Sequence, residues 1–196
     1  MKARADAFDL KDAAPGARPL RPVGSLEIRR RFEAAVAAGD GTTGAHCIHE
    51  LWMRAELATD IDALLVRLWG RAARSIPEWL PMTYIDWLPE AYEVAARFAA
   101  RRRGRSNVYL ILLDYRDRKG GPHGVYVGMS HYTPAQRFDQ HKAGIRASGC
   151  VLKRGLEVLT GPTLHLQRIA RAEAGRIEAE LALALSEAGL LVQGGH

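Results

Sequence analysis

The segment that most constrains the fold is the run NVYLILL at residues 107–113, in which apolar residues do not alternate with polar ones. A strand of this kind is covered on both faces, as the middle strand of a small sheet is. A second apolar run at residues 124–129 follows a Gly-Gly-Pro sequence that favours a turn. We therefore expect a β-hairpin with a long tip, in which the side chain of Tyr109 points inward.

A short helix is expected directly after the hairpin. Thr133 suits its N-cap, Pro134 its first helical position and Gly144 its end. Arg137 and His141 are four residues apart, so both lie on one helical face, which can turn toward the hairpin. Arginine binds phosphate through two parallel hydrogen bonds, and histidine can orient water or transfer a proton. The pair is suited to a phosphate ester.

Two tyrosines, one on each strand of the hairpin, complete a candidate site. Tyr109 ends the triplet Asn-Val-Tyr, and Tyr126 begins the triplet Tyr-Val-Gly. Together with Arg137 and His141, they indicate a site that cleaves phosphodiester bonds. In these triplets, and in the strand, turn and helix that follow the second, the chain resembles the GIY-YIG nucleases over about residues 105–196.

The resemblance implies an α+β fold with a small three-stranded antiparallel sheet flanked by helices. Residues 156–160 supply a suitable third strand, and residues 165–188 favour a helix that ends at Gly189. Two departures from the family pattern are visible. Asn107 replaces the first glycine, and the segment that joins the two triplets is longer than usual. Asparagine tolerates unusual backbone angles and loops tolerate insertions, so the fold is still expected.

The family also implies one glutamate that holds a divalent cation, on the helix after the third strand. Glu173, Glu180 and Glu187 follow one edge of the helix's apolar stripe, whereas Glu178 follows the other, so periodicity leaves the choice open. The pattern Glu-x-x-Leu-Ala-x-x-Leu-x-x-x-Gly, which begins at Glu178, is similar to the family's metal-binding helix. It favours Glu178, with Glu180 as the alternative. The plainer interpretation is an amphipathic helix with solvated glutamates.

The resemblance assigns each of these residues a role in an endonuclease. Glu178 would anchor Mg²⁺ or Mn²⁺ through one carboxylate, and Arg137 would hold the scissile phosphate. Tyr109 would orient or deprotonate the attacking water, and Tyr126 would bind a phosphate oxygen or the water. His141 would assist proton transfer.

One supporting residue of the family has no direct counterpart. The family usually carries an asparagine near the end of the domain, whereas Asn107 is the only asparagine in this chain. Gln193 or His196 lies where such a group would fall, or the role is vacant. A vacant role would favour a nucleic-acid-binding module that has lost turnover.

The bulk composition is compatible with a nucleic-acid partner, DNA in preference to RNA. The 196 residues carry a formal net charge of +6, which favours a polyanion because bound Lys and Arg release the counterions around phosphate. Cys47 and Cys150 are too few for a disulfide framework, so we expect a reducing, cytoplasmic location. Neither a signal peptide nor a membrane-spanning run is visible, so we expect no membrane partner.

The N-terminal half predicts a separate helical module. Residues 1–24 are rich in Pro, Ala, Gly and Arg, and we expect a disordered, mobile arm. Residues 25–104 contain all four tryptophans and thus the material for a core of their own. Four helices are expected in this module, at residues 26–38, 46–57, 60–74 and 90–103. Its role is unknown; a protein-interaction surface is the third functional alternative.

A run of arginines stands just before the first strand of the candidate nuclease domain. It consists of Arg101, Arg102, Arg103 and Arg105. These residues either steer a nucleic-acid backbone toward the site or form a solvated helix end whose charge suits the helix dipole. Near the end of the Arg137 helix, Lys142 and Arg146 are further candidates for nucleic-acid binding.

Overall fold

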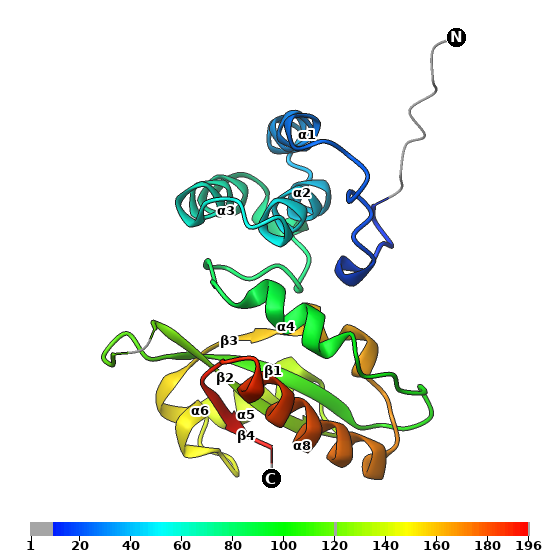
Figure 1. Cartoon of the computed structure of the whole chain (residues 1–196), viewed down its shortest axis with the longest axis vertical. Coiled ribbons are helices and arrows are strands. Elements are labelled where there is room, and N and C mark those ends of the chain that lie inside the picture. The colour runs from blue at the N-terminus through cyan, green and yellow to red at the C-terminus, as the bar shows by residue number, and fades with distance from the viewer. Residues whose placement is uncertain (1–9, 120, 196) are drawn as a thin grey trace. The chain divides into compact units, whose positions relative to one another are not determined.

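The computed structural model describes residues 10–119 and 121–195 (Figure 1). The chain divides between Tyr84 and Ile85 into two compact units, and the second unit carries the sheet. This boundary lies earlier than the one predicted after residue 104, because the helix α4 packs against helices of the second unit.

The first unit is built on three α-helices within its described residues. They are α1 (Ser25–Ala38), α2 (Gly41–Met53) and α3 (Ala58–Ala72), and short 3₁₀ turns lie at η1 (Pro15–Ala17) and η2 (Ala73–Ser75). Gly39 ends α1 with a left-handed φ of 69°, and Asp40 caps α2 by accepting a hydrogen bond from the Thr43 backbone. This cap explains why α2 begins before residue 46, the predicted start.

Residues 10–24 pack against these helices. Leu10 and Leu20 are buried, and Arg18 forms an ion pair with Glu50 at 2.8 Å. Arg54 donates hydrogen bonds to three carbonyl groups of the same segment. The prediction of a mobile arm through residue 24 therefore does not hold from residue 10 onward, because these long-range contacts order it. Residues 1–9 lie outside the described residues.

The second unit contains, within its described residues, a four-stranded sheet with the order β3-β1-β2-β4. The strands are β1 (Asn107–Asp114), β2 (His123–Ser130), β3 (Gly155–Leu159) and β4 (Val192–Gly194). β1 pairs antiparallel with β2 and β3, so the three predicted strands are present. The prediction of a purely antiparallel sheet is corrected by β4, which pairs parallel with β2 (Figure 1).

The helices of the second unit are α4 (Leu88–Ala95), α5 (Pro134–Lys142), α6 (Gly149–Arg154), α7 (Thr160–Thr163) and α8 (Arg171–Glu187), with a 3₁₀ turn at η3 (Leu164–Leu166). α5 begins as predicted, because Thr133 and Gln136 form a reciprocal capping box. α8 packs against β1, β2 and β4, whereas α5 packs against β1 and β3. Among the described residues, no helix combines the length and the apolar character needed to cross a bilayer.

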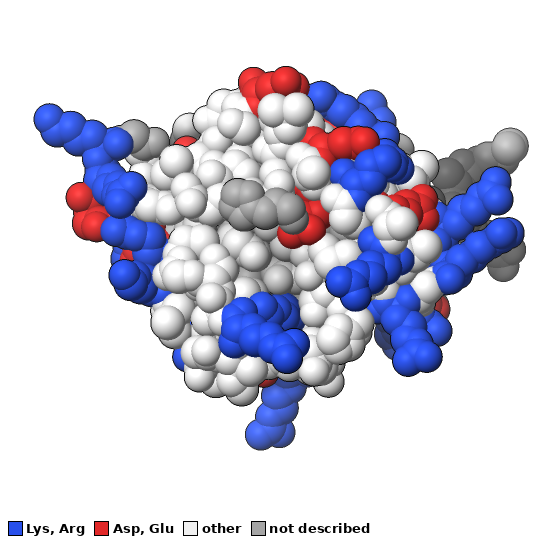
Figure 2. Space-filling model, turned by 90° about the horizontal axis from the view of Figure 1, so that it is seen from below, with Lys and Arg blue, Asp and Glu red and all other residues white. Residues whose placement is uncertain are grey.

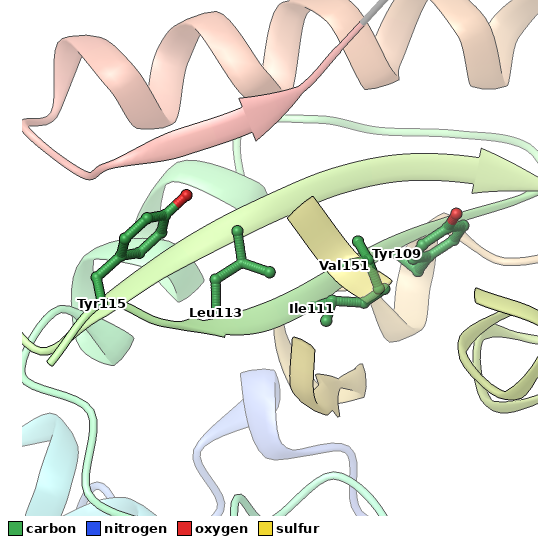
Figure 3. Close-up of a cluster of buried hydrophobic side chains, with 5 residues drawn as sticks. All are labelled: Tyr109, Ile111, Leu113, Tyr115 and Val151. Carbon is green, nitrogen blue, oxygen red and sulfur yellow. The ribbon is translucent and has the colours of Figure 1, made fainter. Parts of the chain in front are cut away.

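Both faces of β1 are buried, as the sequence predicted. Tyr109, Ile111 and Leu113 on one face form a cluster with Tyr115 and with Val151 of α6 (Figure 3). The side chains that alternate with them are fully buried on the opposite face: Val108, Leu110 and Leu112. The strand is therefore held from two sides, which fixes the position of Tyr109 at one end of the cluster.

Candidate active site

Tyr109 and Tyr126 project from the same face of the hairpin. In the β1–β2 register, Tyr109 lies opposite Gly128 and Tyr126 lies opposite Ile111. Side chains two residues apart along a strand point to the same face, so Tyr109, Ile111 and Tyr126 share one face of the sheet. Their ring centroids are 6.2 Å apart. A Cβ atom on Gly128 would lie 2.6 Å from the Tyr109 hydroxyl oxygen and 2.7 Å from a ring carbon of Tyr126. Glycine at this position therefore makes room for both phenols.

His141 on α5 meets both tyrosines. Its Nε2 atom lies 3.3 Å from the Tyr109 hydroxyl oxygen, and its ring packs edge-on to Tyr126 with centroids 5.8 Å apart. The backbone N–H of Ser148 donates to Nδ1 at 2.9 Å. Burial, assisted by the charge of Arg137, lowers the pKa of His141 to about 4, so the ring is neutral at neutral pH.

The Ser148 hydrogen bond assigns the tautomer of this neutral ring. Because Nδ1 accepts a hydrogen bond, the single ring proton belongs on Nε2, which then donates to the Tyr109 hydroxyl oxygen. The hydroxyl's own proton must therefore point away from His141. Tyr109 is thus oriented as a donor toward another partner.

Both phenols are protonated at neutral pH. Burial raises the pKa of Tyr109, the nearby Tyr126 raises it further, and the charge and a hydrogen bond of Arg137 oppose this effect. Burial also raises the pKa of Tyr126, and the Glu178 carboxylate adds to that rise. Glu178 raises the pKa of Tyr109 as well. The two tyrosines and the carboxylate therefore share one local electrostatic environment.

The two candidate metal ligands on α8 have different surroundings. Glu178 is buried, with 8% of its surface exposed, and its negative charge raises the pKa of both tyrosines. The Glu180 side chain is 48% exposed and forms an ion pair with Arg176 at 2.6 Å. Glu178 is therefore close enough to raise the pKa of both tyrosines, whereas Glu180 lies at the solvent-facing side of the helix.

Arg137 lies at the edge of the site, with its guanidinium partly engaged by the protein itself. It donates to the Gln140 side chain, to the Ile145 carbonyl at 3.1 Å and to the Arg146 carbonyl at 2.7 Å. These bonds hold the loop between α5 and α6 against the helix. A phosphate bound by Arg137 would have to replace some of these carbonyls.

Strand β4 brings Gln193 next to Tyr126. The two residues are in register in a parallel pair, so their side chains emerge on the same face of the sheet. Gly194 continues the strand with a φ of 90°, where a Cβ atom would lie 2.1 Å from the Val127 carbonyl oxygen. Gln193 therefore sits at the site, whereas the other candidate for this position, His196, lies outside the described residues.

The basic residues predicted to bind nucleic acid lie at several separate positions on the second unit. Arg102, Arg103 and Arg105 line a pocket with Gly104 and Arg168. Arg168 was missed because nothing in its sequence neighbourhood places it near the arginine run. On the face that Figure 2 presents, Lys and Arg side chains form several separate groups instead of one continuous stripe.

The remaining candidates have local contacts. Lys142 donates to the Gly155 carbonyl at 3.1 Å and thereby ties α5 to β3. Arg146 is exposed on the loop held by Arg137 and has a left-handed φ of 45°. Arg101 is exposed just before the pocket.

The nuclease interpretation implies a divalent cation at this site. Within the described parts of the chain, no group of three or more His, Cys, Asp or Glu side chains is arranged to hold a metal ion. Mg²⁺ in nucleotide and phosphate sites commonly keeps several waters and takes only one or two protein carboxylates. The buried carboxylate of Glu178, which raises the pKa of both tyrosines, therefore fits such an ion.

The chain was compared with protein families, curated proteins and solved structures. No protein-family model matches the chain, and neither a curated protein nor a solved structure matches it.

Proposed function

We propose that this protein is a metal-dependent endonuclease that hydrolyses phosphodiester bonds in nucleic acid, DNA in preference to RNA. The observation that carries the proposal is the convergence of Tyr109, Tyr126, His141 and Glu178, with Arg137 at the edge of the same site. The resemblance to GIY-YIG nucleases in the two triplets and in the α5 and α8 sequences supports the same reaction.

Glu178 would hold Mg²⁺ or Mn²⁺, which would neutralise charge on the phosphate when bound. The tyrosines supply directed hydrogen bonds. Tyr109, with its proton turned away from His141, donates to an oxygen of the attacking water or of the phosphate. Tyr126, whose hydroxyl is on the same face, donates to a second oxygen.

Tyr109 acts as a base only in its phenolate form. The phenolate would take one proton from water, and the hydroxide so formed would attack phosphorus while the leaving oxygen departs. Burial disfavours this phenolate, whereas Arg137 favours it. The Nε2–H of His141 also stabilises it, because a hydrogen bond donated to a charged oxygen is stronger than one to a neutral oxygen.

The structure favours a different role for His141 from the one the sequence suggested. Its lowered pKa and its bond from Ser148 keep the ring neutral, so it is not suited to deliver a proton near neutral pH. We assign it as a positioning residue, which orients the Tyr109 hydroxyl group. Arg137 keeps its assigned role of binding the phosphate, by exchanging the Ile145 and Arg146 carbonyls for phosphate oxygens.

The decisive experiment compares two matched variants on α8. Wild-type protein, Glu178→Gln and Glu180→Gln are incubated with supercoiled plasmid, branched DNA and structured RNA in Mg²⁺ or Mn²⁺, and nicking is measured on gels. Each variant removes one carboxylate charge from the same helix with little change in volume. We expect Glu178→Gln to lose roughly 10²-fold or more in rate, while Glu180→Gln stays close to wild type.

Two results would overturn the proposal. One is a folded wild-type protein that cuts none of these substrates with either ion. The other is equal rates for the two glutamine variants. Metal-independent binding of nucleic acid without cutting would instead favour the non-catalytic binding module.

A further inference from the structure

A pocket of about 530 Å³ lies directly before β1, and four of its five lining residues are arginines. They are Arg102, Arg103, Arg105 and Arg168, and Gly104 is the fifth lining residue. The first three come from the run that precedes β1, whereas Arg168 comes from the segment between η3 and α8. Two stretches of the chain that are far apart in sequence thus bring their cations together.

The backbone builds this pocket. The Gly104 N–H donates to the Arg168 carbonyl at 2.9 Å, and Ser106 and Ile169 exchange two hydrogen bonds at 3.0 and 2.8 Å. A Cβ atom on Gly104 would lie 2.1 Å from the Ile169 carbonyl oxygen. Only glycine allows the two segments to approach this closely, so these hydrogen bonds hold the backbone segments that carry the arginines side by side.

Asn107 links the pocket to the catalytic strand. Its Oδ1 atom accepts the Arg168 N–H at 2.9 Å, and its Nδ2 donates to the Tyr132 carbonyl at 2.8 Å. Asn107 is buried and stands two residues before Tyr109 on β1, so both side chains share a face of the sheet. Arg168 adopts a φ of 60°, which is unfavourable for residues other than glycine. Such backbone angles cluster at ligand-binding sites.

Within the described residues, no acidic side chain forms an ion pair with the arginines that line the pocket. Among the described residues, the ion pairs involve other arginines of the chain, and none includes the four that line the pocket. Arg102 donates to the Leu164 carbonyl at 3.3 Å, and a pocket lined by four positive residues favours an anion. Their planar donor pairs match the oxygens of a phosphate group.

We propose that this pocket binds a second phosphate of the nucleic acid, beside the phosphate that is cleaved. Asn107 would then set the distance between the two phosphates by tying Arg168 to the strand that carries Tyr109. The choice of nucleic acid as the ligand rests on the proposed function. Binding in the pocket requires neither cleavage nor a metal ion.

The test is equilibrium binding of a labelled DNA duplex in EDTA, measured by fluorescence anisotropy over a range of salt concentrations. Arg168→Gln and Arg103→Gln each remove one pocket charge. Arg176→Gln is the matched control, because it removes the same charge from an exposed ion pair on α8. We expect each pocket variant to bind more weakly and to lower the slope of log K against log salt by about 0.9, the value for one lost phosphate contact with duplex DNA. The control should keep the wild-type slope.

The outcomes separate this proposal from the proposed function. Equal weakening by the pocket variants and the control would overturn the pocket, as would a wild-type protein that binds neither DNA nor RNA. Wild-type binding with the expected slopes, but without cleavage in Mg²⁺, would overturn the nuclease and leave the pocket in place.

A second comparison identifies the kind of phosphate. Duplexes with a 5′-phosphate and with a 5′-hydroxyl are bound in parallel by wild type and by Arg168→Gln. A preference for the 5′-phosphate that disappears in the variant identifies a terminal monoester as the ligand. Equal loss of affinity for both duplexes identifies an internal diester.

Discussion

His141 and Tyr109 form one directed hydrogen-bond chain that starts at the backbone. The Ser148 N–H donates to Nδ1 of His141, and Nε2 of the same ring lies 3.3 Å from the Tyr109 hydroxyl oxygen. Because the ring is neutral, the direction of every proton in the chain is fixed. The phenol therefore presents its own proton away from the histidine.

The pH dependence of cleavage should reflect ionisation of the Tyr109 phenol and not of His141. Burial lowers the pKa of His141 to about 4 and raises that of Tyr109, so between pH 5 and 9 His141 stays neutral and Tyr109 stays mostly protonated. Below the pKa of Tyr109, each pH unit increases its phenolate fraction about tenfold. We expect kcat/KM to rise steadily from pH 6 to pH 9 and to be flat in Tyr109→Phe. A maximum near pH 6.5 would show that His141 acts as an acid or base.

Substitution of His141 should separate positioning from proton transfer. A glutamine amide can donate to Tyr109 from nearly the same place as Nε2, whereas leucine cannot. We expect His141→Gln to retain kcat within about tenfold and His141→Leu to lose roughly 10²-fold, with KM similar in both. Steady-state kinetics at pH 8 supply the measurement. Equal losses in the two variants would argue for chemistry that needs the imidazole itself.

The packing of Tyr109 and Tyr126 should require glycine at position 128. A Cβ atom there would lie 2.6 Å from the Tyr109 hydroxyl oxygen, so Gly128→Ala must displace a ring. We expect about 1–3 kcal/mol less free energy of unfolding and roughly 10²-fold slower cleavage, measured by urea denaturation and nicking assays. Gly175→Ala in α8 is the control, since no atom lies within 4 Å of its added Cβ, and it should stabilise by about 0.5–1 kcal/mol. Similar stability changes in the two variants would refute the crowding argument.

The parts of the site that local sequence determines were predicted correctly. The strand β1 follows from an unbroken apolar run, and the start of α5 follows from Thr133 and Pro134, whose effects need no distant partner. Arg137 and His141 therefore appear on the expected helix. Periodicity could not choose between Glu178 and Glu180, and only the packing of α8 distinguishes their surroundings.

The features that were missed depend on contacts between distant residues. β4 has three residues, too few for a hydrophobic period, and it exists because it can pair with β2. The order in residues 10–24 depends on Glu50 and Arg54. The arginine pocket depends on Gly104 lying against Ile169. None of these contacts leaves a pattern in a short window of sequence.

Arg168 should lower the stability of the fold while strengthening DNA binding. A left-handed backbone costs an L-residue about 1–2 kcal/mol relative to glycine, and Arg168 has a φ of 60°. We expect Arg168→Gly to raise the free energy of unfolding by about 1 kcal/mol while weakening DNA binding, measured by urea denaturation and anisotropy. Arg105→Gly is the control: it removes a pocket charge at a position without a positive φ and should bring no gain in stability. A destabilised Arg168→Gly would mean that its side chain serves the fold.

Acid should destabilise the first unit through its buried histidines. Burial lowers the pKa of His49 to about 3 and that of His46 as well, whereas both return to about 6.5 on unfolding. Above pH 6.5 both states are neutral and nothing changes; below it only the unfolded chain gains protons, so stability falls. His49, with its pKa near 3, contributes a slope of about 1.4 kcal/mol per pH unit below pH 6.5, and His46 adds a loss of the same sign. Urea denaturation from pH 7 to pH 5 should show this loss, and His49→Gln should reduce the slope by about one histidine's share. Equal slopes for wild type and His49→Gln would contradict the assignment to this buried ring.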